Sequence, residues 1–198
     1  MMKNRKLVKG IALAAVITAL AAGGTAAYLT DFETATNSFT VGKVDIDLDE
    51  PNWKPEDNTD LVPTQVIRKD PYVANKGVNE AFVYLEVSVP VRNVITVAKD
   101  GTRNALAKTE LFSYTKNTDW TQLNRTEVGQ NMVYTYAYNH ILKPVTKTTT
   151  LFDTVTFANI IEGQLDTQQI DMPVRAYAIQ ATNTGDDKTT VLEQATAA

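Results

Sequence analysis

The chain has 198 residues, a formal net charge of −4 at pH 7 and no cysteine. Its length suits a single domain, and 43 % hydrophobic residues are enough to build a core without disulfide bonds. The acidic balance argues against nucleic acid and anionic lipid surfaces as partners.

The first 27 residues predict a secretory signal peptide. A head that carries Lys3, Arg5, Lys6 and Lys9 and no acid precedes an apolar stretch from Gly10 to Ala22. That stretch is shorter than the roughly 20 residues that a membrane-spanning helix needs. A cationic head, a short apolar segment and small residues after it are typical of a cleaved signal. An uncleaved membrane anchor is the alternative.

The predicted cleavage region is Thr25, Ala26, Ala27 and Tyr28. Thr25 and Ala27 have the small side chains that a signal peptidase accepts at its −3 and −1 positions, so we place the cut after Ala27. Cleavage would remove four of the 19 basic residues and none of the 23 acidic ones, so the mature chain is more acidic than its precursor. We expect it to be secreted, extracellular or associated with the cell surface, and to meet the membrane only before cleavage.

The mature chain divides into an N-terminal arm (residues 28–40), a β-sandwich domain (41–184) and a polar tail (185–198). Short runs rich in valine, threonine and tyrosine alternate with turn residues along the domain, which predicts an all-β fold. We expect an antiparallel sandwich of two sheets, jelly-roll-like, preceded by the helix of the signal peptide.

The individual strands follow in chain order. Residues 43–50 alternate between apolar and acidic side chains, with Val44, Ile46 and Leu48 on one face, as in a half-buried strand. A proline-rich loop follows, and then come the further extended stretches 65–77, 80–91, 119–124, 131–139, 151–157 and 169–182. Pro90 predicts a bend or an edge in its strand, and residues 99–102 predict a hairpin turn.

The sequence offers little catalytic chemistry. Its one histidine, His140, cannot by itself assemble a zinc site, and neither H-E-x-x-H nor G-x-S-x-G occurs. No glycine-rich phosphate-binding loop is present. We therefore predict no catalytic, cofactor-binding or metal-binding residues, no cofactor, and no enzymatic activity.

Two polar patterns allow a binding function as an alternative. Asp45, Asp47 and Asp49 stand in a row about 7 Å apart along one strand face, which does not converge on a calcium ion without help from another segment. The row of Tyr134, Tyr136 and Tyr138 would suit a sugar-binding platform, although such rows more often pack against a facing sheet.

The start of the chain resembles the camelysin/TasA family of exported Gram-positive proteins. The shared features are Gly23-Gly24, the small residues 25–27, Tyr28, Thr30-Asp31, Asn37-Ser38-Phe39 and the strand 42–48. The stretch 69–89 is also similar to the family, whereas residues 91–150 match it poorly. The signal resembles those cleaved by the dedicated SipW-type peptidase.

The resemblance implies a jelly-roll domain outside the cell and, for some members, assembly into biofilm matrix fibres. We therefore expect a secreted matrix protein that forms homo-oligomers or fibres by strand addition, with Val44, Ile46 and Leu48 as the assembly strand. Its other expected partner is the SipW-type peptidase. An extracellular adhesin or ligand-binding module is the alternative. The metallopeptidase that the camelysin name suggests is a third reading.

Overall fold

The structure, a computed structural model, describes residues 44–54, 60–165 and 168–182. The predicted signal peptide, its cleavage region Thr25–Tyr28, the arm 28–40 and the tail from residue 185 lie outside these ranges. The described residues all belong to one compact unit. None of the described segments forms a helix that could cross a membrane.

The described chain is all-β, as the sequence predicts, and every strand pair is antiparallel. The strands are β1 (Ile46–Asp49), β2 (Val66–Arg68), β3 (Tyr72–Asn75), β4 (Ala81–Val94), β5 (Ala107–Glu110), β6 (Phe112–Ser113), β7 (Trp120–Val128), β8 (Asn131–Tyr138), β9 (Thr154–Phe157) and β10 (Val174–Gln180).

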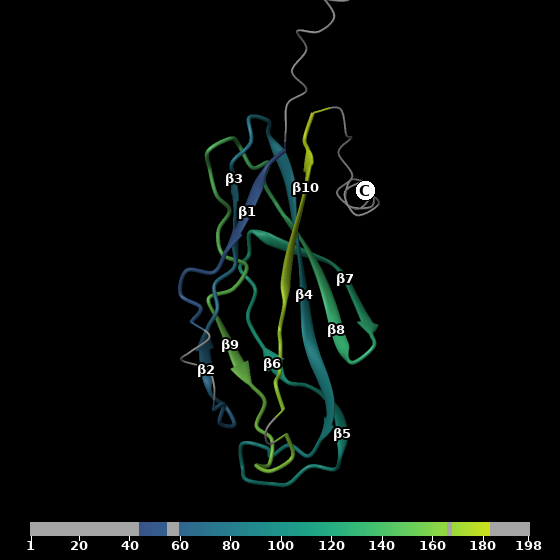
Figure 1. Cartoon of the computed structure of the whole chain (residues 1–198). Coiled ribbons are helices and arrows are strands. Elements are labelled where there is room, and N and C mark those ends of the chain that lie inside the picture. The colour runs from purple at the N-terminus through teal and green to yellow at the C-terminus, as the bar shows by residue number, and fades with distance from the viewer. Residues whose placement is uncertain (1–43, 55–59, 166–167, 183–198) are drawn as a thin grey trace, which may run out of the picture. The chain divides into compact units, whose positions relative to one another are not determined.

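Hydrogen bonding divides these strands into three sheets. The largest has the order β10-β4-β8-β7, with β5 paired to the far end of β4. The smaller sheets are β1-β3 and β2-β9-β6. Figure 1 shows the large sheet on one side and the two small sheets on the other, which gives the two layers of a jelly-roll-like sandwich.

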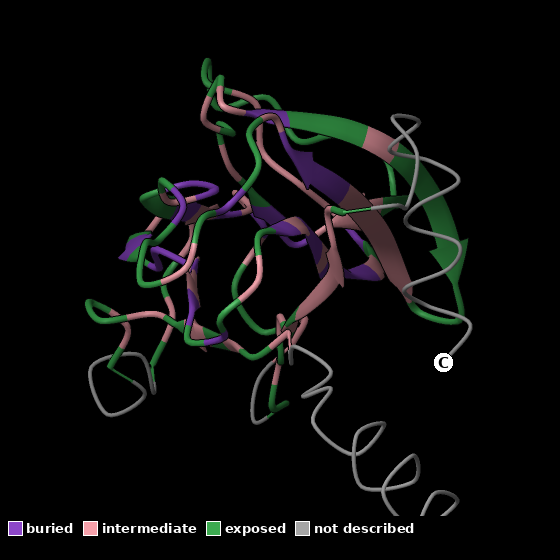
Figure 2. Cartoon of the chain, turned by 90° about the horizontal axis from the view of Figure 1, so that it is seen from above, coloured by how far each residue is buried: buried purple, intermediate pink, exposed green. Residues whose placement is uncertain are grey.

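The core lies between these layers because each inner face is apolar. Alternation along β4 buries Val83, Leu85, Val87 and Val89 at 1 % exposure or less. Trp120 is fully buried and packs against Tyr138, with ring centroids 5.0 Å apart. Figure 2 shows these buried segments running through the middle of the molecule.

Pro90 lies inside the long strand β4 and does not end it. Along one edge, β4 pairs with β10 up to Val87 and with β5 from Val91 onward. The Pro90 carbonyl accepts a hydrogen bond from the Leu111 N–H at 2.8 Å on that same edge. The proline has no N–H to return this bond, and the Leu111 carbonyl accepts a hydrogen bond from the Ala158 N–H at 2.9 Å instead, so it is not left unpaired.

The single extended stretch predicted at 65–77 is wrong, because the structure divides it into β2 and β3. Pro71 separates them, and the two strands join different sheets. The predicted turn near Gly101 is present: the Ala98 N–H donates to the Thr102 carbonyl at 2.8 Å, and Gly101 has a φ of 85°. That left-handed conformation suits glycine.

Candidate functional site

The strands β1 and β10 lie side by side without pairing to each other. β1 pairs only with β3, and β10 pairs only with β4, among the strands that the structure describes. Cα atoms of the two strands nevertheless approach within 8 Å, and Figure 1 shows β1 between β3 and β10. We refer to these two neighbouring unpaired edges as the β1/β10 site.

The register shows which backbone groups face this site. In β10, Pro173 and Ala181 exchange hydrogen bonds with the β4 side, so the alternate residues Val174, Ala176 and Ala178 direct their N–H and C=O groups away from β4. The side chains of these three residues pack against the core. Within the described residues, the β10 edge therefore combines backbone groups that no second strand pairs with and inward apolar side chains.

The β1 edge has the same construction. The Lys76 N–H donates to the Asp45 carbonyl at 2.7 Å, which fixes the register with β3 and leaves Ile46 and Leu48 with backbone groups directed outward. Both side chains are half-buried and pack on the core. The structure thus places Ile46 and Leu48 of the predicted assembly strand in a sheet of their own chain, with one edge open. Val44, two residues before β1, is also half-buried.

Charged groups are clustered where β1 ends. Glu50 Oε2 accepts a hydrogen bond from Lys69 Nζ at 2.7 Å, and both side chains are mostly buried. The Lys69 ammonium also lies 4.9 Å from the centre of the Trp53 ring. Buried Asp70 accepts two hydrogen bonds from Asn52, at 2.9 and 2.7 Å. These contacts tie the chain after β1 to the start of β3.

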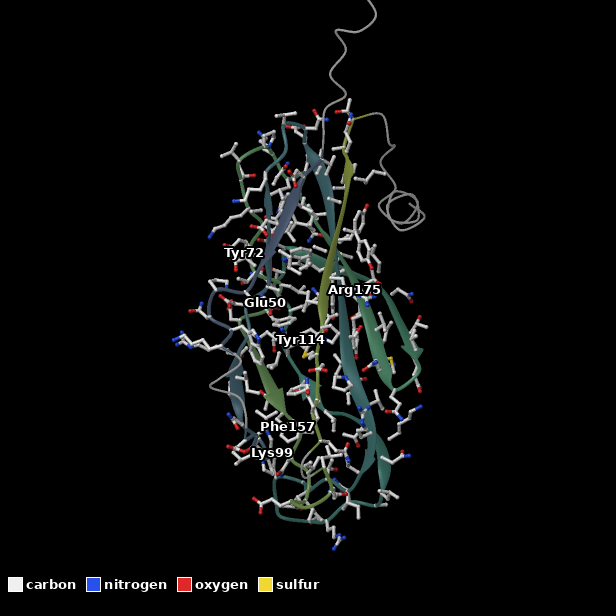
Figure 3. All side chains as sticks on the ribbon, in the orientation of Figure 1. Glu50, Tyr72, Lys99, Tyr114, Phe157 and Arg175 are labelled. Carbon is white, nitrogen blue, oxygen red and sulfur yellow. The ribbon has the colours of Figure 1, made fainter. Side chains whose placement is uncertain are left out.

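The aspartate row on β1 remains on the surface. Asp45, Asp47 and Asp49 are all exposed, and Asp49 accepts a hydrogen bond from the Tyr72 hydroxyl at 2.9 Å. That hydrogen bond raises the pKa of Tyr72, because it is made by the protonated phenol to a carboxylate. Figure 3 shows Tyr72 and Glu50 beside β1.

The tyrosine row of β8 points toward the core, so it forms no surface platform for a sugar. Tyr136 is 3 % exposed and Tyr138 is 9 % exposed. The Tyr136 and Tyr114 hydroxyls share a hydrogen bond of 2.9 Å, and the Tyr114 ring packs against that of Phe152 in a tilted arrangement, with ring centroids 4.3 Å apart. Burial first, and then this hydrogen bond, raise the pKa of Tyr114 far above its usual value. Figure 3 shows Tyr114 in the middle of the molecule.

Tyr134, at the outer end of the row, joins a charged group. Its hydroxyl donates to Glu110 Oε2 at 2.7 Å and accepts from Arg125 Nε at 3.0 Å. Arg125 also forms an ion pair with Glu110 at 2.5 Å. Burial raises the pKa of Tyr134. These contacts connect β5, β7 and β8 and give each of the three side chains a hydrogen-bond partner.

Residues that could bind a metal do not come together in the described part of the chain. No group of three or more His, Cys, Asp and Glu side chains there could hold an ion. His140 is exposed, and its Nε2 lies 3.9 Å from a single carboxylate, that of Asp119. The buried Glu50 Oε1 has no hydrogen-bond partner, but the other oxygen of Glu50 already pairs with the Lys69 ammonium. The described residues therefore do not fit a catalytic zinc ion, which needs three protein ligands.

A shallow groove opens on the outer side of β6 and β9. It has a volume of about 550 Å³ and is lined by residues 113–117 together with Phe152, Asp153, Thr154 and Thr156. Its walls are mainly hydroxyl groups, and Lys116 Nζ is held by the Trp120 carbonyl at 2.8 Å. Ligand sites usually combine an apolar lining with a few convergent polar groups, which this groove lacks.

These features define a β-sandwich protein with two adjacent open strand edges. The sequence profile of the family described as camelysin metallo-endopeptidase matches residues 2–171, and the chain belongs to this family. The match runs through residues 91–150, where the resemblance was weak. Proteins of this family are exported or membrane-associated. No curated protein and no solved structure matches the chain.

The family match contradicts the prediction that the chain has no enzymatic activity. The family is described as a metallo-endopeptidase, which makes proteolysis a possible activity of its members. The prediction failed because it relied on the absence of H-E-x-x-H, and that motif is only one of the ligand arrangements that bind zinc.

The sequence reasoning did not find the open edge of β10 or the buried Lys69–Glu50 pair. The alternation of residues 174–179 signals a strand, but which of its edges stays unpaired depends on strand order, which periodicity does not encode. Lys69 lies between Arg68 and Asp70, so nothing in the local sequence distinguishes it from a solvent-exposed charge.

Proposed function

We propose that this camelysin-family protein acts outside the cell as a self-assembling protein, and that copies join by addition of a β-strand at the β1/β10 site. The observation that carries the proposal is the pair of neighbouring edges whose outward backbone groups come from residues with inward apolar side chains. An added strand could form main-chain hydrogen bonds with these edges and set its register by alternate side chains.

The N-terminal arm of a second copy is the proposed added strand. Residues 28–40 directly precede β1 in the sequence and include threonines and the aromatic residues Tyr28, Phe32 and Phe39, which favour extended structure. Before signal cleavage the arm would be continuous with the leader. Cleavage after Ala27 by a SipW-type peptidase would free it for donation.

An inserted strand requires β1 and β10 to separate. Paired strands lie about 4.8 Å apart, so a strand between them would place the two edges about 10 Å from each other. β1 is the element that would move, because it has only four residues and one paired neighbour. β10 has seven residues and pairs with the central strand β4 along its whole length.

The proposal is tested by comparing the mature chain 28–198 with the chain 41–198 by sedimentation velocity and electron microscopy. We expect oligomers or filaments from the first and monomers from the second, with the same β-rich circular dichroism spectrum for both. A synthetic peptide of residues 28–40 should bind the 41–198 protein, and a scrambled peptide of the same composition should not. Two monomeric proteins, under all conditions tried, would contradict strand donation.

The family match favours metal-dependent proteolysis as a second candidate function. It predicts that the purified mature protein contains stoichiometric zinc and cleaves an unfolded protein substrate in a reaction that a chelator stops. His140→Ala tests whether the one histidine contributes to metal binding. Zinc-free protein that gains no cleavage when zinc is added would exclude this candidate.

A further inference from the structure

The groove beside β6 and β9 opens where the pairing of these two neighbouring strands is interrupted (Figure 1). Their ladder ends at the pair formed by Ser113 and Thr156. Hydrogen bonding resumes at Asn117, whose N–H donates to the Leu151 carbonyl at 2.7 Å. Three residues separate these two points on the β6 side and four on the β9 side, so the two segments cannot stay in register.

The local sequence explains this interruption. Leu151 and Phe152 are consecutive and are only 0 % and 1 % exposed, although consecutive residues of a regular strand point to opposite faces. The Thr150 hydroxyl donates to the Asp153 carboxylate at 2.8 Å, which stabilises the bend before β9 begins. The chain therefore enters β9 with one residue more than regular pairing allows, and the groove is a consequence of the fold.

The interruption leaves the backbone of Thr154 without a strand partner on the groove side. The Asp153 carbonyl, one residue earlier, points toward β2 and accepts from the Lys69 N–H at 3.2 Å. Backbone groups of a strand alternate in direction, so the N–H and C=O of Thr154 point the other way, toward residues 114–116. No backbone hydrogen bond within the described chain joins Thr154 to that segment. A backbone donor and a backbone acceptor therefore face the groove.

The side chains of the groove add hydroxyl groups above an aromatic floor. Four of the lining residues carry hydroxyl groups on the strand surface: Ser113, Thr115, Thr154 and Thr156. None of these four hydroxyls hydrogen-bonds to another group in the part of the chain that the structure describes. The apolar lining consists of Tyr114 and Phe152, which belong to the core or pack on it and so form the floor.

The chemistry of this lining distinguishes between classes of ligand. An apolar molecule would leave the hydroxyls and the Thr154 backbone unpaired, which costs free energy. An anion would meet the Asp153 carboxylate, while the one cation of the lining, Lys116, already donates to the Trp120 carbonyl. An extended peptide needs a row of backbone partners, whereas Thr154 provides those of a single residue. A neutral sugar offers hydroxyls that donate and accept, and an apolar C–H face that packs on aromatic rings.

We propose that this groove binds a neutral sugar unit. The Thr115 hydroxyl and the hydroxyl and backbone of Thr154 hydrogen-bond to the sugar hydroxyls, and the C–H face of the sugar rests on Tyr114 and Phe152. The volume of about 550 Å³ is within the range of ligand sites. The polar walls that make the groove unsuitable for an apolar ligand are the ones that a sugar requires. The site lies on the β2-β9-β6 sheet, so the inference stands whether or not strand addition occurs at the β1/β10 site.

Saturation-transfer difference NMR on the 28–198 protein tests the proposal, because it detects the bound sugar and works for monomers and assemblies alike. Glucose, galactose and N-acetylglucosamine are the neutral probes, and glucuronic acid is an anionic counterpart. We expect saturation of at least one neutral sugar, strongest at the C–H protons of one ring face, and weaker saturation of the acid. No saturation of any neutral sugar, or stronger saturation of the acid, would overturn the proposal.

A pair of double variants assigns the binding to the groove. Thr115→Val with Thr154→Val removes two lining hydroxyls and keeps the shape of both side chains, so it should weaken binding at least about tenfold. Thr121→Val with Thr126→Val removes two exposed hydroxyls from β7 in the other layer and should leave binding unchanged. Circular dichroism checks that both variants keep the fold. Full binding by the first variant, or equal loss in both, would contradict the assignment to this groove.

Discussion

The two outer edges of the large sheet differ in how open they are to another strand. The β10 edge is regular: seven residues pair with β4 without a register shift. The β7 edge is interrupted by a register shift between Gln122 and Asn124. β7 is also mostly exposed and carries Arg125 and Glu127, which pair with residues of β5.

The difference matches the ways in which proteins control strand addition. Bulges and charged side chains on an edge strand discourage pairing with other chains. β7 has both, whereas β10 has an inward face of Val174, Ala176 and Ala178 and only one charged residue, Arg175. A sheet can therefore protect one edge and leave the other open to pairing, which favours β10 and its neighbour β1 as the edges used in the proposed assembly.

The largest expected effect comes from proline on the β10 edge. Ala176→Pro removes an N–H that faces β1 and spares the hydrogen bonds to β4, so it should abolish assembly of the 28–198 protein while the fold remains. Gln122→Pro is the matched control, because it removes an outward N–H from the exposed β7 edge. Sedimentation velocity should show monomers for the first variant and unchanged oligomers for the second. Equal loss in both variants would contradict the difference between the edges.

The ion pairs near the two edges should differ in their contribution to stability. Glu50→Gln leaves the Lys69 ammonium buried without a counter-charge, which should lower the free energy of unfolding by about 3 kcal/mol. Glu127→Gln breaks the more exposed pair with Lys108 and should cost less than about 0.5 kcal/mol. Urea denaturation of the 41–198 protein measures both. Similar losses would mean that burial does not distinguish the two pairs.

Removing the bulge should allow the β7 edge to pair with a strand of another chain. Deletion of Leu123 would restore regular alternation with β8 and present a continuous edge, so we expect the 41–198 protein, which is otherwise monomeric, to associate without the arm 28–40. Leu123→Ala keeps the bulge and controls for the lost side chain. Light scattering of the 41–198 proteins reports the effect. An unchanged monomer after the deletion would show that the bulge does not protect this edge.

The smallest effect concerns the buried tyrosines between the sheets. Tyr114→Phe removes the hydrogen bond to Tyr136 and should cost about 1 kcal/mol at pH 7. The raised pKa of Tyr114 means that the folded protein keeps a proton that the unfolded chain releases above about pH 10. The contribution of protonated Tyr114 to the free energy of unfolding is therefore complete below about pH 10 and decreases as the pH rises above that value. Tyr114→Phe should make this fall less steep in chemical denaturation between pH 9 and 11. If the stability of the variant falls with pH as steeply as that of the parent protein, Tyr114 is not the source of this pH dependence.

The strands were predictable from the sequence where alternation is strong. Residues 43–50 and 80–91 alternate cleanly and form β1 and most of β4. The stretch 65–77 was misread because both of its halves have strand composition, and only Pro71 marks the change of sheet. The inward direction of the tyrosine row could not be read from β8 alone, since both faces of that strand carry residues that favour strands.

The candidate site was only half predictable. Ile46 and Leu48 were identified from local alternation, but the edge that they share with β10 joins residues about 130 positions apart in the chain. No short-range pattern contains that contact, because it follows from the order of strands in two sheets. The metallopeptidase reading was placed last for a different reason: a motif search tests only known spacings, whereas the family profile compares residues 2–171 as a unit.

Hydrogen exchange measured on assembled and monomeric 28–198 protein tests the β1/β10 site most directly. We expect assembly to slow exchange at the outward amides of β1 and β10, those of Ile46, Leu48, Ala176 and Ala178, and to leave those of Gln122 and Arg125 on β7 unchanged. Protection gained on β7, or no gain at β1 and β10 in protein that has assembled, would contradict it.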